Sequence, residues 1–363
     1  MKKNKNYVDL KDQPVPEGQH LLEVDDLKMY FHTEDGVVRA VDGVSYTLDR
    51  GETLGVVGES GSGKSVTAMT IMGLISMPPG KIEGGDVRYR GRSILEMTEE
   101  EMQHIRGNDI AMIFQDPMTS LNPVYMIGKQ VGEGLRLHRG YSKQEALKRA
   151  TELLDLVGIP EPEKRVNEYP HQFSGGMRQR VMIAMALACD PDILIADEPT
   201  TALDVTIQAQ IIELMQEMQE KNGNAIIMIT HDLGVVADMA DKIMVMYAGR
   251  PVEFGTAEEI FYESRHPYTW GLIRSIPEQA IDEKKPLTPI HGNPPSLMNL
   301  PEGCVFSPRC PYATDKCRKQ RPERVVTESG HYSACHYSGD PEFLKNAPET
   351  SRTRKDSKKG GEA

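Results

Sequence analysis

A glycine-rich loop near the start of the chain constrains the fold more than any other feature. Gly58-Glu59-Ser60-Gly61-Ser62-Gly63-Lys64-Ser65 follows the apolar run Thr53–Val57, which predicts a strand, and precedes residues 66–75, which predict a helix. This arrangement is typical of a phosphate-binding loop, because glycines let consecutive backbone N–H groups face a polyphosphate. The positive end of the following helix adds to the attraction. The sequence therefore predicts a nucleotide-binding domain.

The residues of this loop have different expected roles toward a nucleotide. Lys64 supplies a point charge for the β- and γ-phosphates of ATP, and Ser65 can ligate Mg²⁺. The remaining phosphate contacts are expected from Gly58, Ser60, Gly61, Ser62, Gly63 and Val66. A glycine-rich turn that matches by chance is the alternative, but the strand and the helix on either side favour a nucleotide site.

Composition places the chain among ordinary globular proteins and argues against several partners. Hydrophobic residues make up 39% and charged residues 26% of the 363 positions, and 42 basic against 54 acidic side chains give a formal net charge of −12. Such an acidic chain is a poor candidate for binding nucleic acid or anionic lipid. No apolar stretch reaches the roughly 20 residues that span a bilayer, and none follows the basic N-terminus as in a signal peptide. We therefore expect a cytoplasmic protein that another protein must hold if it works at a membrane.

Two adjacent acids end a second apolar run. Ile193–Asp197 predicts a buried strand, and Glu198 follows it directly. Because alternate strand side chains point in opposite directions, the two acids cannot have the same role. Asp197 suits the ligand shell of Mg²⁺, whereas Glu198 suits a base that polarises an attacking water. Two merely solvated acids at a strand end are the alternative, which the nearby phosphate loop disfavours.

The order of the apolar patterns predicts an α/β fold. Residues 21–31 and 37–48 alternate apolar and polar positions, which predicts an antiparallel β subdomain. The pattern is helical from about residue 118 to residue 180, and strands and helices alternate after it, which predicts a mostly parallel core sheet with helices. The expected organisation is a flexible segment at 1–18, the nucleotide-binding domain at 19–285, a loop-rich cysteine module at 286–340 and a disordered tail at 341–363.

Further motifs give the chain a resemblance to ABC-type ATPases. Ser174-Gly175-Gly176, at the start of a predicted helix, resembles the signature motif of that family. The other motifs of the family are present in the expected order along the chain. Phe31, or the neighbouring Tyr30, lies where the family stacks an aromatic ring on adenine, and Gln115 matches the Q-loop glutamine. After the signature, Asp204 matches the D-loop and His231 the switch histidine. The resemblance covers roughly residues 20–275 and implies an ABC-type ATPase domain.

The resemblance implies a catalytic group around the attacking water. Glu198 would act as the base, and His231 and Gln115 would help to hold the water and the γ-phosphate. Gln115 would also reach Mg²⁺ beside Ser65 and Asp197. A lone histidine is more often structural, but His231 follows a predicted core strand in register with the other motifs.

The resemblance also implies a dimer. The signature residues of one chain would contact the nucleotide bound by a second, homologous ATPase subunit arranged head to tail. One chain carries one set of motifs, so two complete sites need two chains, and a heterodimer is expected. The signature departs from the commoner family pattern at Phe173 and Met177, but these departures leave Ser174 and Gly176 in place.

Four of the five cysteines fall close together near the C-terminus. Separated by five, six and seventeen residues are Cys304, Cys310, Cys317 and Cys335. Zinc sites usually show two close Cys-x-x-Cys pairs, which are absent here, whereas wider and irregular spacing suits an iron–sulfur cluster. A structural 4Fe–4S cluster is therefore favoured over a zinc site or unligated thiols.

The segment around these cysteines resembles the C-terminal extension of the ATPase subunits of oligopeptide and dipeptide permeases. The resemblance rests on residues 303–311, 266–269 and 292–295. Some members of that group hold a 4Fe–4S cluster at four matching cysteines. The implied function is ATP hydrolysis that powers peptide import through two transmembrane permease subunits, at the cytoplasmic face of the plasma membrane, with an extracytoplasmic peptide-binding protein as an indirect partner.

Two other functions stay open at this point. The same motor would also serve import of nickel, glutathione or an oligosaccharide, since the binding protein and the pore choose the cargo. A soluble ABC ATPase that acts on ribosomes or DNA would carry two motif sets or a coiled-coil insertion, and neither is present in this sequence. The acidic charge also argues against a nucleic-acid partner.

Overall fold

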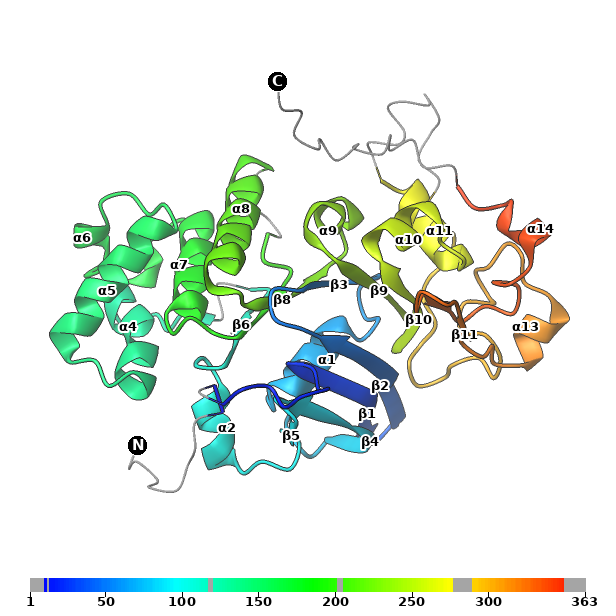
Figure 1. Cartoon of the computed structure of the whole chain (residues 1–363), viewed down its shortest axis with the longest axis horizontal. Coiled ribbons are helices and arrows are strands. Elements are labelled where there is room, and N and C mark those ends of the chain that lie inside the picture. Colours follow the sequence, from blue (N-terminus) through cyan, green and yellow to red (C-terminus); the bar gives the residue numbers. More distant parts are fainter. Residues whose placement is uncertain (1–9, 12, 117–119, 201–204, 277–288, 349–363) are drawn as a thin grey trace.

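Two β-sheets and the helices around them form the molecule. The computed structural model describes residues 10–348, apart from residue 12, residues 117–119, residues 201–204 and residues 277–288. The smaller sheet has the strand order β2-β1-β4-β5, and the larger sheet has the order β11-β12-β10-β9-β3-β8-β7-β6. Figure 1 shows helices α4–α7 at one end of the molecule, the C-terminal elements at the other end, and β3 between them.

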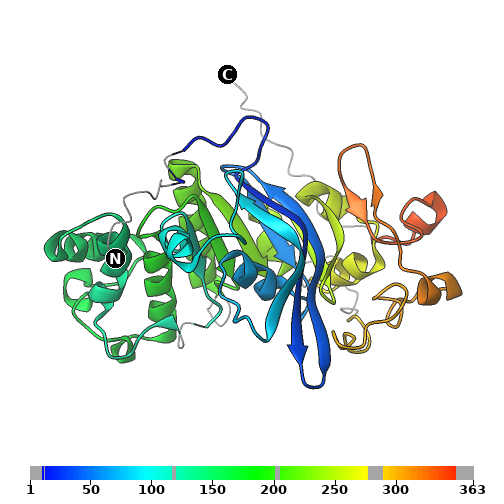
Figure 2. The ribbon, with the colours of Figure 1, turned by 90° about the horizontal axis from the view of Figure 1, so that it is seen from below.

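The smaller sheet is antiparallel, as the alternating pattern predicts. Its strands are β1 Leu22–Thr33, β2 Gly36–Leu48, β4 Gly80–Tyr89 and β5 Arg92–Ser93. Leu22 pairs with Leu48 and Thr33 pairs with Gly36, so β1 and β2 form the long hairpin that projects downward in Figure 2. The buried side chains of this sheet share one apolar core with α1 and with one face of the larger sheet.

The larger sheet is parallel at its centre and antiparallel at one edge. Its strands are β3 Thr53–Val57, β6 Ile110–Ile113, β7 Ile193–Asp197, β8 Ala225–Thr230, β9 Lys242–Tyr247, β10 Arg250–Thr256, β11 Val325–Val326 and β12 Tyr332–Ser333. Strand β3 runs parallel to β8 and β9, and β7 runs parallel to β6 and β8. The predicted α/β fold with a mostly parallel core sheet is therefore confirmed.

Most helices come after strands in the chain, in the alternating order that the sequence pattern predicts. They are α1 Lys64–Ile71, α2 Glu99–Ile105, α4 Ile127–His138, α5 Lys143–Leu156, α6 Pro162–Arg165, α7 Gly175–Leu187, α8 Val205–Asn222, α9 Leu233–Met239, α10 Ala257–Tyr262, α11 Pro267–Arg274, α13 Asp315–Lys319 and α14 Pro341–Leu344. A 3₁₀ turn spans Pro170–Gln172. Among the described residues, no helix has both the length and the apolar character that crossing a membrane requires.

One helix ends earlier than the sequence pattern predicts, and another helix, α2, was not predicted. The first helix was expected over residues 66–75, but α1 ends at Ile71 and Gly73 follows in a left-handed conformation, with φ +59°. Such a glycine is a common way to end a helix. The sequence pattern gave no strong apolar period for α2. Its signal is the capping box, in which Thr98 accepts from the Glu101 N–H and the Glu101 carboxylate accepts in return.

Helices α4, α5 and α7 form a small bundle at the edge of the larger sheet. They pack on one another, and α7 also packs on the edge strand β6. Leu135, Leu153 and Ile183 are among the side chains that this bundle buries. The bundle corresponds to the helical subdomain expected at about 118–180, of which residues 117–119 lie outside the described part of the chain.

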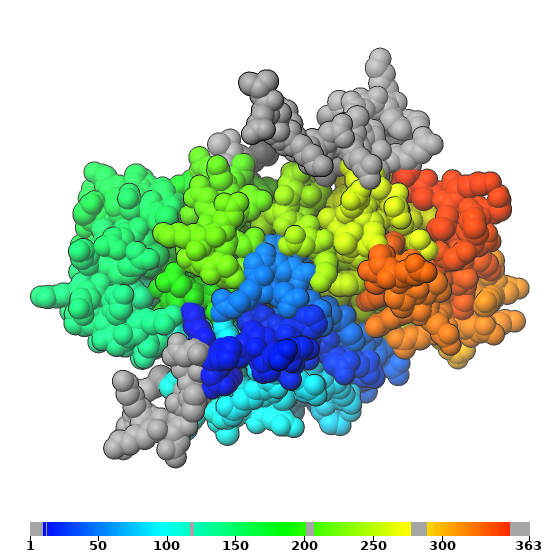
Figure 3. Space-filling view, in the orientation of Figure 1, coloured from blue at the N-terminus to red at the C-terminus, as the bar shows by residue number. Residues whose placement is uncertain are grey.

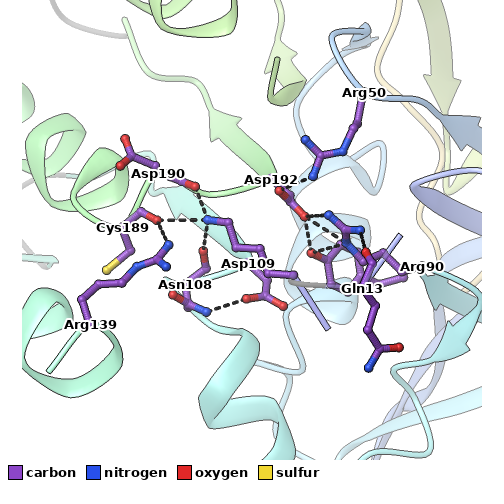
Figure 4. A network of polar contacts seen from close by, with 11 residues as sticks. Gln13, Arg50, Arg90, Asn108, Asp109, Arg139, Cys189, Asp190 and Asp192 are labelled. Carbon is purple, nitrogen blue, oxygen red and sulfur yellow. Dashed lines mark hydrogen bonds and ion pairs between the residues drawn. The ribbon is translucent and has the colours of Figure 1, made fainter. Parts of the chain in front are cut away.

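Part of the N-terminal segment expected to be flexible, 1–18, contacts the domain at the residues that the structure describes. Leu10 is buried, and the Lys11 ammonium donates to the carbonyls of Asn108 and Cys189. Arg90 donates to the Gln13 carbonyl and to the buried Asp192 carboxylate in the network of Figure 4. The network ties the segment to the loops that precede β6 and β7 and to the turn between β4 and β5.

The C-terminal residues extend the larger sheet instead of forming a separate unit after residue 286. Strand β12 pairs antiparallel with β10, with Phe254 opposite Tyr332. Next to that pair, the ring nitrogen Nε2 of His331 lies 3.0 Å from the carboxylate of the fully buried Glu253. Figure 3 shows the C-terminal elements, in orange and red, packed against the rest of the molecule.

The last helix corrects the expected start of the disordered tail. Residues 341–363 were expected to be disordered, but α14 occupies the first of these positions. Phe343 packs on Trp270 and Tyr312, with ring centroids 5.3 and 5.4 Å apart. These contacts hold α14 against α11. Residues 349–363 lie outside the described part of the chain.

The packing of β3 against α9 gives a prediction for stability. A Cβ added at Gly55 would lie 2.2 Å from Cγ1 of Val236. We expect Gly55→Ala to lower the free energy of unfolding by about 1–3 kcal/mol, as overpacking does in other cores. Denaturant unfolding of the variant measures this cost.

The matched control is the double variant Gly55→Ala/Val236→Ala. Removing the Val236 methyl groups makes room for the new Cβ, so the double variant should be more stable than the sum of the two single changes implies. Additive costs would show that the two positions do not compete for space.

Candidate nucleotide site

The phosphate loop joins β3 to α1, and at two of its glycines a side chain would clash with neighbouring backbone. Gly58 and Gly63 have φ values of +150° and +101°. A Cβ at Gly58 would lie 2.2 Å from the Met246 carbonyl oxygen, and one at Gly63 would lie 2.3 Å from the Ala40 carbonyl oxygen. The loop is therefore held close to its neighbours, with its N–H groups at the N-terminus of α1.

Lys64 is the first residue of α1, and its side chain folds back over the loop. Its ammonium donates to the carbonyls of Gly58 and Glu59 at 2.6 and 3.0 Å. Burial lowers the pKa of Lys64, while Glu198 and Asp197 act in the opposite direction. The geometry keeps a cation at the centre of the loop, where a polyphosphate would need it.

Ser65 and Asp197 meet beside the loop. The Ser65 hydroxyl donates to the Asp197 carboxylate at 3.0 Å, which joins the start of α1 to the end of β7. Burial raises the pKa of Asp197, and the neighbouring Glu198 raises it further. A buried carboxylate beside a hydroxyl is the kind of oxygen ligand set that Mg²⁺ prefers, and bound Mg²⁺ would relieve the cost of burying that charge.

Glu198 lies between two polar side chains from other strand ends. Gln115 donates through Nε2 to one carboxylate oxygen at 3.0 Å, and Nδ1 of His231 lies 3.3 Å from the other. Glu198 has a left-handed backbone with φ +48°, and its N–H donates to the Ile229 carbonyl on β8. Non-glycine residues seldom adopt this conformation, which clusters at functional sites. The structure thus brings together three residues that are far apart in the sequence.

The signature residues lie at the start of α7, away from the phosphate loop of their own chain. The Ser174 hydroxyl caps the helix by accepting from the Met177 N–H at 3.3 Å, and Ser174 and Gly175 are exposed. Because α7 packs on β6, which is three strands from β3, about 14 Å of sheet separates it from the strand that carries the loop. Ser174, Gly175 and Gly176 are thus presented at an outer face.

Gln179 connects the signature helix to the acid pair and was not singled out by the sequence. Its buried side chain donates to the Pro199 carbonyl at 2.6 Å, one residue after Glu198. Its signal is its position one helical turn after Ser174-Gly175-Gly176, on the face that packs inward. The contact fixes the end of β7 relative to α7.

The aromatic pair on β1 has one member tied by a hydrogen bond. The Tyr30 hydroxyl donates to Asp42 at 2.9 Å, and Arg39 lies 5.9 Å from the Tyr30 ring centroid. Phe31 packs partly buried against the apolar core beside α1. Which ring stacks on adenine stays a prediction. Asp204, the expected D-loop residue, lies outside the described part of the chain.

The four C-terminal cysteines converge on one cavity. They line it together with Phe306, Tyr312 and other side chains. Burial, with a smaller contribution from the neighbouring cysteines, raises the pKa of Cys310 to about 11 and that of Cys335 to about 12. Four thiolates here would repel one another without a positive centre. Within the described residues, no group of three or more His, Cys, Asp or Glu side chains has an arrangement that holds a metal ion.

Two family models match separate parts of the chain. The family described as "ABC transporter" matches residues 41–201, which include the phosphate loop, the signature and the acid pair. The family described as "Oligopeptide/dipeptide transporter, C-terminal region" matches residues 252–317, which include three of the four clustered cysteines. The boundary between the two matches falls within the larger sheet, between β7 and β10.

Curated relatives match over most of the chain. The oligopeptide transport ATP-binding protein OppD of Bacillus subtilis is 58% identical over 312 residues, which are 86% of this chain and 87% of that protein. The dipeptide transport ATP-binding protein DppD of Escherichia coli is 52% identical over 320 residues, which are 88% of this chain and 97% of that protein.

A solved structure has the same fold over the ATPase domain. It is a dimeric ATP-binding cassette in a post-hydrolysis state with bound ADP and Pi. It has a TM-score of 0.60 and 29% identity, and the match covers 65% of this chain and 98% of that chain. The remaining third of this chain has no counterpart in it.

Removal of the Glu198 charge should separate binding from turnover. Glu198→Gln keeps the size and the polar contacts of the side chain but removes its ability to accept a proton. We expect ATP to bind as before while hydrolysis falls by about 10²–10⁴-fold, which is the usual contribution of a general base. Equilibrium binding and steady-state phosphate release measure the two effects. Turnover above about a tenth of the wild-type rate would show that Glu198 is not the base.

The matched variant Lys64→Ala should act one step earlier. The Lys64 ammonium is the side-chain cation inside the loop, and its loss removes the charge that faces the phosphates. We expect weaker ATP binding in a direct titration of this variant. An unchanged dissociation constant would contradict the assignment of the loop.

Proposed function

The chain belongs to the ATP-binding proteins of ABC transporters, in the oligopeptide and dipeptide class, and we propose that it hydrolyses ATP to power peptide import. One observation carries the enzymatic part of this proposal. The Glu198 carboxylate is held between Gln115 and His231, next to the Ser65–Asp197 pair and the Lys64 ammonium. A base, a phosphate-binding cation and an oxygen ligand set therefore lie at one edge of the core sheet.

The chemistry follows from these positions. The loop N–H groups and Lys64 bind and orient the β- and γ-phosphates, and Ser65 and Asp197 would hold Mg²⁺, which neutralises charge on the phosphates when bound. Glu198 polarises the attacking water, while His231, with a side chain that is 61% exposed, is free to turn toward the γ-phosphate. Gln115 follows the edge strand β6, where a neighbouring subunit could contact it and shift its position.

The exposed signature supports a site shared between two chains. Ser174 and Gly176 lie at a helix N-terminus, which attracts phosphate, yet the sheet separates them from their own phosphate loop. A head-to-tail dimer would place them on the γ-phosphate of the partner subunit. The partner is a second ATPase subunit, which we propose to be a homologue of this chain.

Exposed apolar residues in the segment that follows β6 support docking to a membrane subunit. Phe114 is 38% exposed, and after the Q-loop Val124, Tyr125 and Met126 are 70%, 44% and 42% exposed. Three consecutive exposed apolar residues such as Val124, Tyr125 and Met126 are typical of sites of protein contact. We propose that one of two transmembrane permease subunits covers them, so that the protein is peripheral at the cytoplasmic face of the plasma membrane. An extracytoplasmic peptide-binding protein would then supply the cargo to the pore.

The four cysteines support a 4Fe–4S cluster more than zinc. Zinc sites usually have two close Cys-x-x-Cys pairs, whereas five, six and seventeen residues separate these four cysteines. The four cysteines line one cavity, and four thiolates there would be the ligands of an iron–sulfur cluster. Cys304, Cys310, Cys317 and Cys335 would hold it, and its positive charge would offset the cost of the buried thiolates.

The docking surface gives a test of the transport function. Coexpressed with its permease subunits, the wild-type chain should copurify with them, and the complex should hydrolyse ATP faster than the isolated chain. Tyr125→Asp should abolish copurification and this stimulation, because a charge would be buried at the interface, while ATP affinity stays unchanged. The control is Leu137→Asp, on the far end of α4 with 52% exposure, which should behave as wild type. Equal copurification of both variants would remove Tyr125 from the interface.

Iron analysis tests the cluster. Anaerobically purified protein should be brown and contain about four irons per chain. Cys310→Ser should lose the colour and the iron, whereas Cys189→Ser should keep both, because Cys189 lies in the core between the sheet and the helical subdomain. Colourless protein with one tightly bound zinc would assign the cysteines to a zinc site instead.

A further inference from the structure

The cysteine module contacts the phosphate loop through one ion pair. Arg309 directly precedes Cys310, and its two terminal nitrogens donate to the Glu59 carboxylate at 2.5 and 2.9 Å. Glu59 is the second residue of the phosphate loop. The side chains of Arg309 and Glu59 are 4% and 29% exposed, so the pair lies largely away from water. Bidentate pairs of this kind fix geometry as well as charge.

The Arg309 side chain is held on every side. Its Nε donates to the His291 carbonyl at 3.0 Å, and one terminal nitrogen also donates to the Ile290 carbonyl at 3.2 Å. The other terminal nitrogen lies 3.3 Å from the Tyr247 hydroxyl at the end of β9. A guanidinium with this many fixed acceptors has one available position, and that position is set by the C-terminal segment.

A second contact joins the same two regions. The Glu59 N–H donates to the Tyr268 hydroxyl at 2.9 Å, so α11 holds the backbone of the loop while Arg309 holds its side chain. The Tyr268 ring packs on Phe306 with centroids 5.4 Å apart, and Phe306 lines the cysteine cavity. The turn around Phe306 is in turn tied to Cys304 and Cys310 by backbone hydrogen bonds.

The charge of Glu59 makes this contact relevant to ATP. A carboxylate inside a phosphate-binding loop repels a polyphosphate, and low exposure strengthens that repulsion. Lys64 donates to the backbone carbonyl of Glu59 and is engaged on the inner side of the loop. Arg309 supplies the opposite charge from the outer side, at the carboxylate itself.

We propose that Arg309 is a positioning residue for the phosphate loop, through which the C-terminal cysteine module sets the affinity of the chain for ATP. The proposal rests on the proposed ATPase function and adds a regulatory input to the same site. It assigns no contact between Arg309 and the nucleotide. Arg309 acts through Glu59, by neutralising its carboxylate and by fixing the outer side of the loop.

Binding of MgATP to the purified full-length chain tests the proposal. Arg309→Gln leaves the Glu59 carboxylate uncompensated, and we expect the dissociation constant for ATP to rise about tenfold. The double variant Glu59→Gln/Arg309→Gln has no unpaired charge, so its dissociation constant should return to within about threefold of the wild-type value. A merely structural role for Arg309 predicts no such recovery, because the double variant restores the charge balance and not the ion pair.

Two controls make the outcome decisive. Arg318→Gln makes the same substitution in the same module, but its pair with Asp315 is exposed, so ATP affinity should not change. Arg309→Lys keeps the positive charge and loses the bidentate geometry, so it should bind ATP better than Arg309→Gln, and it serves in its place if that variant does not fold. Wild-type affinity in folded Arg309→Gln, or a double variant as weak as the single one, would overturn the proposal. Failure of the wild-type chain to bind ATP would instead contradict the ATPase function itself.

Discussion

The parallel pairing of β6, β7, β8 and β3 is the constraint on which the site depends. Because these strands run in one direction, their carboxyl ends meet at one edge of the sheet. Each of the four ends with a functional segment, and the segments carry Gln115, Glu198, His231 and the phosphate loop. Ligands bind at this edge in open α/β sheets for the same reason. Any change that disturbs the register of these strands would separate the catalytic residues.

The fold and the centre of the site could be predicted from the sequence because their signals are local. The phosphate loop has its glycines, its strand and its helix within two dozen residues, and the period of the apolar residues distinguishes strands from helices along the core. The convergence of Gln115 and His231 on Glu198 follows once the strands are known to be parallel. The roles assigned to these side chains remain predictions that the variants above address.

The remaining features depend on contacts that no local pattern encodes. Arg309 and Glu59 are 250 positions apart, and an arginine beside a cysteine suggests nothing about a distant loop. The same holds for Lys11, whose ammonium is fixed by three carbonyls from two loops that come together only in the folded chain. Polar residues near a terminus look like a flexible segment until the partner surface is present, which is why the sequence pattern indicated neither the burial of Leu10 nor the packing of α14. Whether such residues are ordered depends on tertiary contacts, and these contacts leave no periodic pattern in the sequence.

The short strand β12 has a consequence for any shortened form of this protein. Strand β10 is covered along part of its outer side by β12, and its buried Glu253 carboxylate relies on His331, two positions before Ser333. A chain that stopped before residue 325 would leave the unpaired N–H and C=O groups of β10 open to other chains. Open strand edges recruit further strands and lead to aggregation. A shortened ATPase domain of this protein should therefore include β12, so that this edge of the core sheet stays covered.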